Sequence, residues 1–130
     1  MSTLSGAMRV SASGLVAERF RMDVISSNIA NANSMKIGNQ MPYRRRDVAL
    51  TGDLDGVRIV GIVEDQSAFR LVNDPGNPNA DSEGNVMYTN VEPIHEMVNM
   101  IGASRAYEAN IAAFNSAKGM IRSALQIGKI

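Results

Sequence analysis

The chain has 130 residues, with 13 basic and 13 acidic side chains, one His and no Cys. That length suits one compact domain, or a small domain with long helical arms. The absence of Cys excludes disulfides, thiolate metal sites and cysteine catalysis. No apolar run reaches the roughly 18 residues that span a bilayer, and no cleaved secretory signal is expected. A net charge of zero argues against general nucleic-acid binding.

The charges are unevenly distributed along the chain. Residues 1–46 carry a net charge of +5, residues 47–96 carry −8, and residues 97–130 carry +3. Chance variation in a small sample is one explanation. The other is that the basic ends of one copy meet the acidic middle of another copy, which would set register more than affinity.

The first predicted element is a helix over residues 3–33. Apolar side chains recur at alternating spacings of four and three, a heptad stripe typical of coiled-coil packing. Gly6 and Gly14 each lower the intrinsic helix stability by about 1 kcal/mol relative to Ala. Such a helix needs neighbours to hold it. The stripe consists of Leu4, Met8, Leu15, Met22, Ile25 and Ile29.

A second helix is predicted over residues 94–128. Asn90 is expected to cap its start, with Pro93 early in the first turn. One set of side chains repeats every seven residues, and a second set follows it four residues further along the helix. Together they form a heptad pattern over four repeats. The first set is Met100, Tyr107, Phe114 and Ile121, and the second set is Met97, Ser104, Ile111, Lys118 and Leu125.

The middle of the chain is predicted to be β-rich. Strands are expected at residues 57–63, 70–72 and 86–89, because these runs are rich in β-branched and aromatic residues. Turns or loops are expected at residues 51–56 and 73–79. The fold class is therefore α+β: long N- and C-terminal helices pair as a coiled-coil-like hairpin, and the small middle segment leans on them.

Catalysis and dedicated metal binding are not expected. His95 is the only histidine, so neither a triad nor a two-histidine metal site can form. The acids Asp65, Asp74, Asp81 and Glu83 do not follow the calcium-loop spacing. The basic run at residues 44–46 is too short to be a nucleic-acid signature and is expected to be solvated or ion-paired.

Three asparagines, Asn28, Asn31 and Asn33, cluster at the end of the first predicted helix. Asparagine is a poor helix-interior residue because its amide competes for backbone partners. Fraying of the helix end explains Asn33 but not Asn28. We therefore expect these amides to tie the helix end to neighbouring backbone.

This asparagine motif, at residues 27–34, resembles the signature that ends the N-terminal helix of bacterial flagellar rod and hook proteins. Residues 103–110, Ala-Ser-Arg-Ala-Tyr-Glu-Ala-Asn, are a second matching block. Asn77 and Ser34 depart from the usual His and Thr. Shorter matches at residues 41–45, 62–65, 74–78, 83–86, 90–91 and 96–98 extend the likeness to the flagellar basal-body rod family, specifically its proximal rod proteins.

The resemblance implies a structural, non-enzymatic subunit with no cofactor. Such subunits are exported uncleaved by the flagellar type III apparatus and assemble in the periplasm into a hollow rod that transmits torque. The implied partners are other copies of the chain and other rod proteins. Surrounding ring proteins are further candidate partners. Residues 1–35 and 93–130 would supply the helices of an inner tube, and residues 36–92 the outer segment.

The residues expected to mediate assembly are the helical stripes, the asparagine cluster and the second matching block. Two alternatives remain: another flagellar axial protein, or a soluble helical-hairpin adaptor. Arg105 and Glu108 can pair along one helix face. The expected assembly residues are Leu4, Met8, Leu15, Met22, Ile25, Asn28, Ile29, Asn31, Asn33, Met97, Met100, Arg105, Tyr107, Glu108, Asn110, Ile111, Phe114, Ile121 and Leu125.

Overall fold

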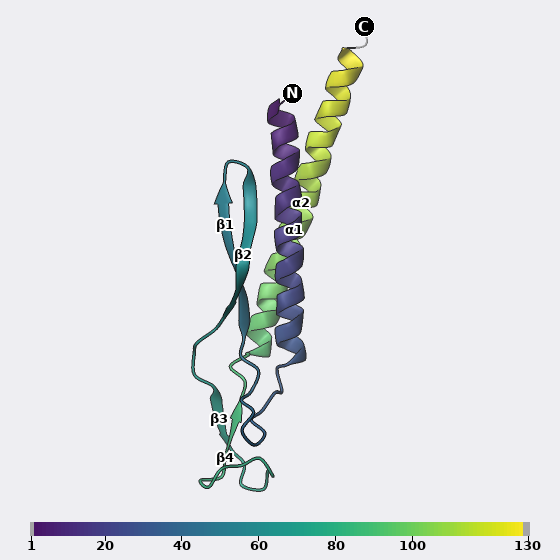
Figure 1. The fold of residues 1–130 in the computed structure, drawn as a ribbon. Coiled ribbons are helices and arrows are strands. Elements are labelled where there is room, and N and C mark those ends of the chain that lie inside the picture. The colour runs from purple at the N-terminus through teal and green to yellow at the C-terminus, as the bar shows by residue number, and fades with distance from the viewer. Residues whose placement is uncertain (1, 129–130) are drawn as a thin grey trace. The chain divides into compact units, whose positions relative to one another are not determined.

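The computed structural model describes residues 2–128, with side chains from residue 3 onward. Two long helices stand at the two ends of the chain, with four short strands between them (Figure 1). The chain is therefore α+β, as predicted. The elements are α1 (Ser2–Ala30), β1 (Arg46–Asp53), β2 (Gly56–Glu64), β3 (Arg70–Asn73), β4 (Asn85–Tyr88) and α2 (Pro93–Ile127).

Both predicted helices form, and their ends lie within a few residues of the expected positions. Helix α1 ends at Ala30, where the backbone N–H of Asn31 donates to the carbonyls of Ser27 and Asn28 in a final turn. Helix α2 begins at Pro93, whose fixed φ suits a first helical position. Within the described residues, neither helix combines the length and the apolar character that a transmembrane segment requires.

The strands form two separate two-stranded sheets. The predicted strands at residues 57–63, 70–72 and 86–89 correspond to β2, β3 and β4. The turn predicted over residues 51–56 is shorter in the structure than predicted. Strand β1 continues to Asp53, so only residues 54–55 connect it to β2. A connection that short joins antiparallel strands. In the other sheet β3 pairs antiparallel with β4, with Leu71 opposite Met87 and Val72 opposite Val86.

The chain divides into two compact units, each built from segments that are distant in sequence. The first unit contains residues 1–22, 48–61 and 101–130, and the second contains residues 23–47 and 62–100. In the first unit, the N-terminal part of α1 lies beside α2, and the tip of the β1–β2 hairpin lies beside α1 (Figure 1). In the second unit, β4 pairs with β3 and also hydrogen-bonds to the segment after α1 through Lys36 and Met87.

The two units differ in what they bury. In the first unit, each buried apolar side chain among the described residues is an alanine: Ala17, Ala103 and Ala117. The second unit buries larger side chains, namely Val24, Ile25, Val86 and Val91 with Ala32. The larger apolar side chains of the first unit, such as Leu15 and Phe114, are only half-buried, and because burial stabilises in proportion to apolar area, part of their stabilising area stays unused.

Candidate assembly site

The amide of Asn28, in the last turns of α1, is fully shielded from solvent. Its Nδ2 donates to the carbonyl of Arg46 at 2.8 Å and to Glu96 Oε2 at 3.1 Å. Its Oδ1 accepts from the Tyr43 hydroxyl at 2.8 Å and from the Arg46 backbone N–H at 3.0 Å. One side chain thus satisfies partners on the loop after α1, on the start of β1 and on α2.

Glu96 is the anionic centre of this cluster and is also fully buried. It lies in the first turn of α2, where the helix dipole favours negative charge. Arg45 Nε donates to its Oε1, and Arg45 Nη1 lies 3.5 Å from Asp47 Oδ2 and 3.4 Å from Asp65 Oδ2. Burial alone would lower the pKa of Arg45, but the hydrogen bond to Glu96 and the three carboxylate charges raise it above its ordinary value.

Asn90 and Asp65, which follow β4 and β2, also hydrogen-bond within this cluster. Asn90 Oδ1 accepts from the Arg45 backbone N–H at 2.7 Å, and its Nδ2 donates to the Asp65 carbonyl at 3.0 Å. The predicted N-cap role of Asn90 is therefore wrong: α2 begins three residues later, and this amide binds Arg45 instead. The backbone N–H and hydroxyl of Ser67, with the Arg45 charge, hold the pKa of Asp65 below its ordinary value against the effect of burial.

We call Asn28, Tyr43, Arg45, Asp65, Asn90 and Glu96 the polar cluster; all six belong to the second unit. No buried side-chain nitrogen or oxygen of the described residues lacks a hydrogen-bond partner. A fully satisfied polar network specifies one packing arrangement. Across residues 2–128 no group of three or more acidic or histidine side chains is placed to hold a metal ion.

The basic run at residues 44–46 contributes to the same region. Arg45 is ion-paired, which was one of the two expected outcomes. Arg44 donates to the carbonyls of Asp65 and Ser67 at 2.8 and 2.9 Å, and its guanidinium lies 4.2 Å from the ring centre of Phe69. These contacts attach the residues just before β1 to the segment between β2 and β3.

The first unit holds its helices together through small residues. A Cβ added to Gly14 of α1 would lie 2.7 Å from Asn110 Nδ2 of α2. Asn110 in turn donates to the carbonyl of Ala106 at 2.9 Å. Glycine at position 14 therefore allows an approach between the helices that a larger residue would prevent.

The β1–β2 hairpin is attached to α1 by Ser13. Its Oγ donates to the Val10 carbonyl at 2.6 Å and accepts from the Val57 backbone N–H at 3.0 Å. The buried Gly56 beside it has a φ of +122°, and a Cβ there would collide with the Ser13 hydroxyl. A glycine is required at this position for both reasons.

The structure divides the predicted stripe of α2 between two faces. Met100, Tyr107, Phe114 and Ile121 are half-buried, whereas Met97, Ile111 and Leu125 are exposed. The buried companions of the first set are instead Glu96, Ala103 and Ala117, with Asn110 half-buried between them. Arg105 and Glu108 are exposed, and no ion pair of the described residues joins them.

Along α1 the predicted residues lie on or near the buried face. Ile25 and Asn28 are buried, Asn31 is half-buried with its Nδ2 donating to the Ser27 carbonyl at 2.8 Å, and Asn33 is exposed. The remaining predicted residues are half-buried: Leu4, Met8, Leu15, Met22 and Ile29.

Sequence reasoning missed Arg45, Tyr43 and Glu96 as members of the polar cluster. Glu96 had one usable signal, because it stands seven residues before Ala103 and therefore on the buried seam of α2. A glutamate on a buried seam needs a cation, and the run at residues 44–46 offers three.

Comparison with known proteins identifies two matching families. Residues 8–34 match the family described as "Flagella basal body rod protein", and residues 82–127 match the one described as "Flagellar basal body rod FlgEFG protein C-terminal". The first match contains Gly14 and Asn28, and the second contains Asn90 and Glu96.

Relatives align over almost the whole chain. The flagellar basal-body rod protein FlgC of Bacillus subtilis is 42% identical over 94% of this chain and 96% of its own length. The FlgC proteins of Borreliella burgdorferi and Salmonella typhimurium are 39% and 38% identical over 95% and 92% of this chain, and the alignments cover 97% and 94% of those proteins. The chain belongs to the FlgC family of flagellar basal-body rod proteins and is a structural subunit of the rod.

Proposed function

We propose that this rod subunit assembles with copies of itself and with other rod proteins into a hollow helical shaft in the periplasm. It reaches that site through the flagellar type III apparatus without cleavage, and the shaft transmits torque and passes exported subunits. Residues 1–35 and 93–130 form the inner tube, and residues 36–92 form the outer segment. Ring proteins that surround the shaft are further candidate partners. The subunit is not proposed to bind nucleic acid.

One observation carries this proposal: α2 exposes apolar side chains along its length while α1 covers only one side of it. Ile101 is 55% exposed, Ile111 39% and Leu125 58%. The first unit fully buries only alanines among its described apolar residues, and these exposed side chains are apolar area available for further burial. Neighbouring subunits in a tube would cover them, and such heterologous contacts build helical assemblies.

The polar cluster supports a mechanical role for the second unit. It connects the end of α1, the start of β1 and the start of α2 through buried hydrogen bonds. Buried polar networks resist rearrangement because every displaced group would lose its partner. A subunit that transmits torque requires such a fixed geometry where its helices meet its strands.

The test is a deletion strain complemented with variants of the chain. We expect loss of the rod beyond the inner-membrane ring in the deletion strain, and recovery of swimming with the unchanged chain. Ile111→Asp and Leu125→Asp place a charge on the exposed face of α2 and should abolish recovery, because an unpaired carboxylate cannot be buried at an interface.

Ser123→Asp is the matched control, since Ser123 is also exposed on α2 and the charge change is the same. It should swim like the unchanged chain. Hooks and filaments of ordinary length in the deletion strain would refute the rod assignment and favour an adaptor. Full swimming with Ile111→Asp and Leu125→Asp would refute assembly through this helix.

A further inference from the structure

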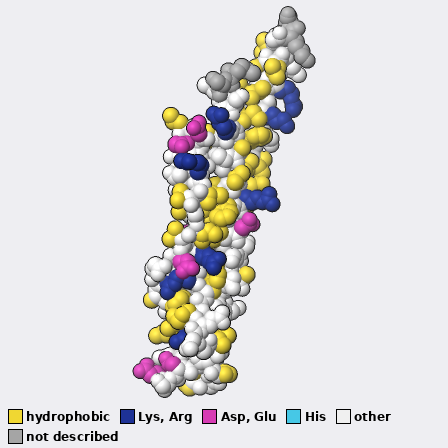
Figure 2. Space-filling model, in the orientation of Figure 1, with side chains coloured by type: hydrophobic (Ala, Val, Ile, Leu, Met, Phe, Trp, Pro, Cys, Tyr) yellow, Lys and Arg dark blue, Asp and Glu magenta, His cyan; other side chains and the backbone are white. Residues whose placement is uncertain are grey.

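The C-terminal half of α2 carries an exposed face that is both apolar and basic. Ile111, Lys118, Arg122 and Leu125 follow at spacings of seven, four and three, which places them on one side of the helix. All four are exposed, and no acidic residue occurs after Glu108. Neither cation forms an ion pair within the described residues. We call these four residues the basic strip; Figure 2 shows basic side chains beside apolar ones along this part of α2.

The loop between β3 and β4 has the opposite character. Asp74, Asp81 and Glu83 are exposed there, and no Lys or Arg occurs from residue 71 to residue 104. Asp81 fixes the loop, because its Oδ1 accepts from the backbone N–H groups of Glu83 and Asn85, both at 2.9 Å. The three carboxylates are in no ion pair of the described chain. We call this loop the acidic loop.

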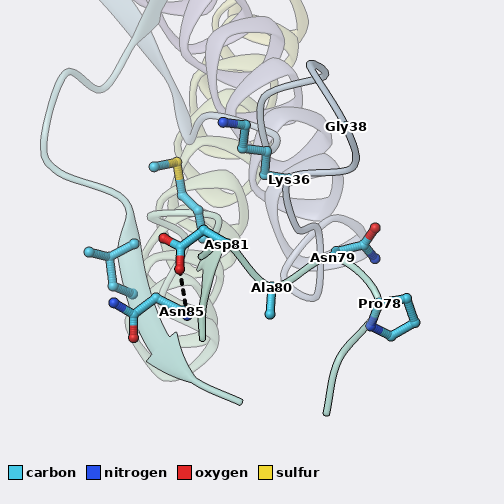
Figure 3. Close-up of a pocket in the computed structure, with 9 residues that line it drawn as sticks. Lys36, Gly38, Pro78, Asn79, Ala80, Asp81 and Asn85 are labelled. Carbon is cyan, nitrogen blue, oxygen red and sulfur yellow. Dashed lines mark hydrogen bonds between the residues drawn. The ribbon is translucent and has the colours of Figure 1, made fainter. Parts of the chain in front are cut away.

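A hollow with a largely polar lining adjoins the acidic loop (Figure 3). It has a volume of about 260 Å³; Leu71 and Met87 of the β3–β4 sheet belong to its apolar part, and Lys36, Asp81 and Asn85 belong to its polar part. Leu71 is 60% exposed. The hollow is large enough for an aliphatic side chain, and the loop beside it supplies negative charge.

The two surfaces lie in different compact units with opposite net charges. The first unit, which carries the basic strip, has eight basic and four acidic side chains, a net charge of +4. The second unit, which carries the acidic loop, has five basic and nine acidic side chains, a net charge of −4. Charge complementarity of this kind steers association and fixes register.

We infer that the basic strip of one copy docks on the acidic loop of a second copy. Lys118 and Arg122 would face Asp74 and Glu83, and an aliphatic side chain of the strip would enter the hollow beside Leu71. The occupant is a second copy because one chain carries both complementary surfaces. The contact is heterologous and leaves one unused surface on each partner, to which a further copy can add. This inference rests on the proposed function, namely assembly of the chain with itself.

A charge-exchange experiment tests this pairing. One variant carries Lys118→Glu and Arg122→Glu, and a second carries Asp74→Lys and Glu83→Lys; Asp81 is left unchanged because it holds the loop together. A third chain carries all four changes. The control, Arg19→Glu, makes the same charge change as Arg122→Glu alone, which is measured beside it; Arg19 is exposed on α1 and forms no ion pair within the described residues. Self-association of the purified full-length proteins is measured by sedimentation at low and high salt.

Each two-site variant should associate about tenfold more weakly than the unchanged protein, because attractive pairs become repulsive. Mixing the two variants, or combining the four changes in one chain, should restore association, and high salt should shrink the differences. The control should behave like the unchanged protein. Unaltered association of the two-site variants, an equal effect of the control, or no recovery on mixing would each overturn the inference.

Complementation of the deletion strain separates this inference from the proposed function. Failure of the unchanged chain to restore swimming would refute the proposed function. If the unchanged chain restores swimming, each two-site variant should fail, and co-expression of both should restore it. Full swimming with a single two-site variant, or no recovery on co-expression, would refute the pairing and leave the rod function intact.

Discussion

Glu96 and Asn28 show how a buried polar side chain is made tolerable in this chain. A buried carboxylate costs several kcal/mol of desolvation unless it is paired and hydrogen-bonded. Glu96 has the Arg45 guanidinium on one oxygen and the Asn28 amide on the other. Exposed ion pairs such as that of Arg9 with Asp55, at 3.8 Å, contribute little by comparison.

Glu96→Ala is therefore expected to destabilise the protein by about 3 kcal/mol, because Arg45 would remain buried without its main partner. Glu92→Ala is the control: Glu92 lies four residues earlier, is exposed, and its side chain makes no hydrogen bond within the described residues. Urea denaturation of both variants measures the difference. Equal midpoints would show that the polar cluster does not stabilise the fold.

Asp65 makes the stability of the second unit depend on pH. Its pKa is lowered by the hydrogen bonds from Ser67 and by the charge of Arg45. A lowered pKa stabilises the folded state above the unfolded-state pKa of about 3.9, and this contribution is lost as the pH falls through the folded-state value.

Asp65→Asn should therefore flatten the loss of stability between about pH 5 and pH 2. Denaturation midpoints measured across that range provide the test. Glu83→Gln, at an exposed carboxylate without an ion pair in the described chain, should leave the slope unchanged. A slope as steep in the Asp65→Asn variant as in the unchanged protein would contradict the assignment.

Only part of the polar cluster was predictable from sequence. Asn28 could be singled out because a helix interior disfavours its amide. The pairing of Arg45 with Glu96 spans 51 residues, and no local pattern specifies which arginine of the run turns inward. That choice depends on the path of the loop after α1, which tertiary packing determines.

At the scale of elements, glycine has different roles at different helix positions. Gly14 faces Asn110 across the helix contact, with no room for a Cβ, whereas at Gly119 no atom beyond its chain neighbours and the adjacent backbone of its own helix lies within 4 Å of the position a Cβ would take. Intrinsic propensity alone would favour alanine at both sites by about 1 kcal/mol.

Gly119→Ala should accordingly stabilise the protein by up to about 1 kcal/mol, while Gly14→Ala should destabilise it because Asn110 must move. The two substitutions are chemically identical, so each serves as the control for the other. Thermal unfolding followed by circular dichroism measures both. A gain in stability from Gly14→Ala would show that the close approach of the helices is not required.

Heptad spacing located both helices and placed the α1 residues on or near its buried face, but on α2 it missed the most buried row. The buried seam of α2 runs through Glu96, Ala103, Asn110 and Ala117, a row in which apolar character is weak. The prediction instead included the neighbouring row, because Met97, Ile111 and Leu125 in that row are large and apolar. Strand β1 was missed for a related reason: its sequence is only partly β-branched, and its pairing with β2 completes it.

At the scale of the whole molecule, stability is unevenly divided. The helices comprise 29 and 35 residues, yet their packing in the first unit fully buries only alanines among the apolar side chains and leaves the larger ones half-buried or exposed. Long helices without such burial are only marginally stable in water. The second unit has the larger buried side chains and the polar cluster.

We therefore expect the dilute, unassembled protein to open locally in its first unit before its second. In hydrogen exchange, amides of residues 5–20 of α1 should exchange faster than those of residues 25–30 of the same helix, because only the latter adjoin the polar cluster. The comparison is internal to one helix, so solvent and temperature are matched. Assembly should slow exchange in residues 5–20, since neighbouring helices would supply the missing burial. Uniform protection along α1 in the dilute protein would mean that the first unit is self-sufficient, and the exposed face of α2 would then no longer indicate a requirement for neighbours.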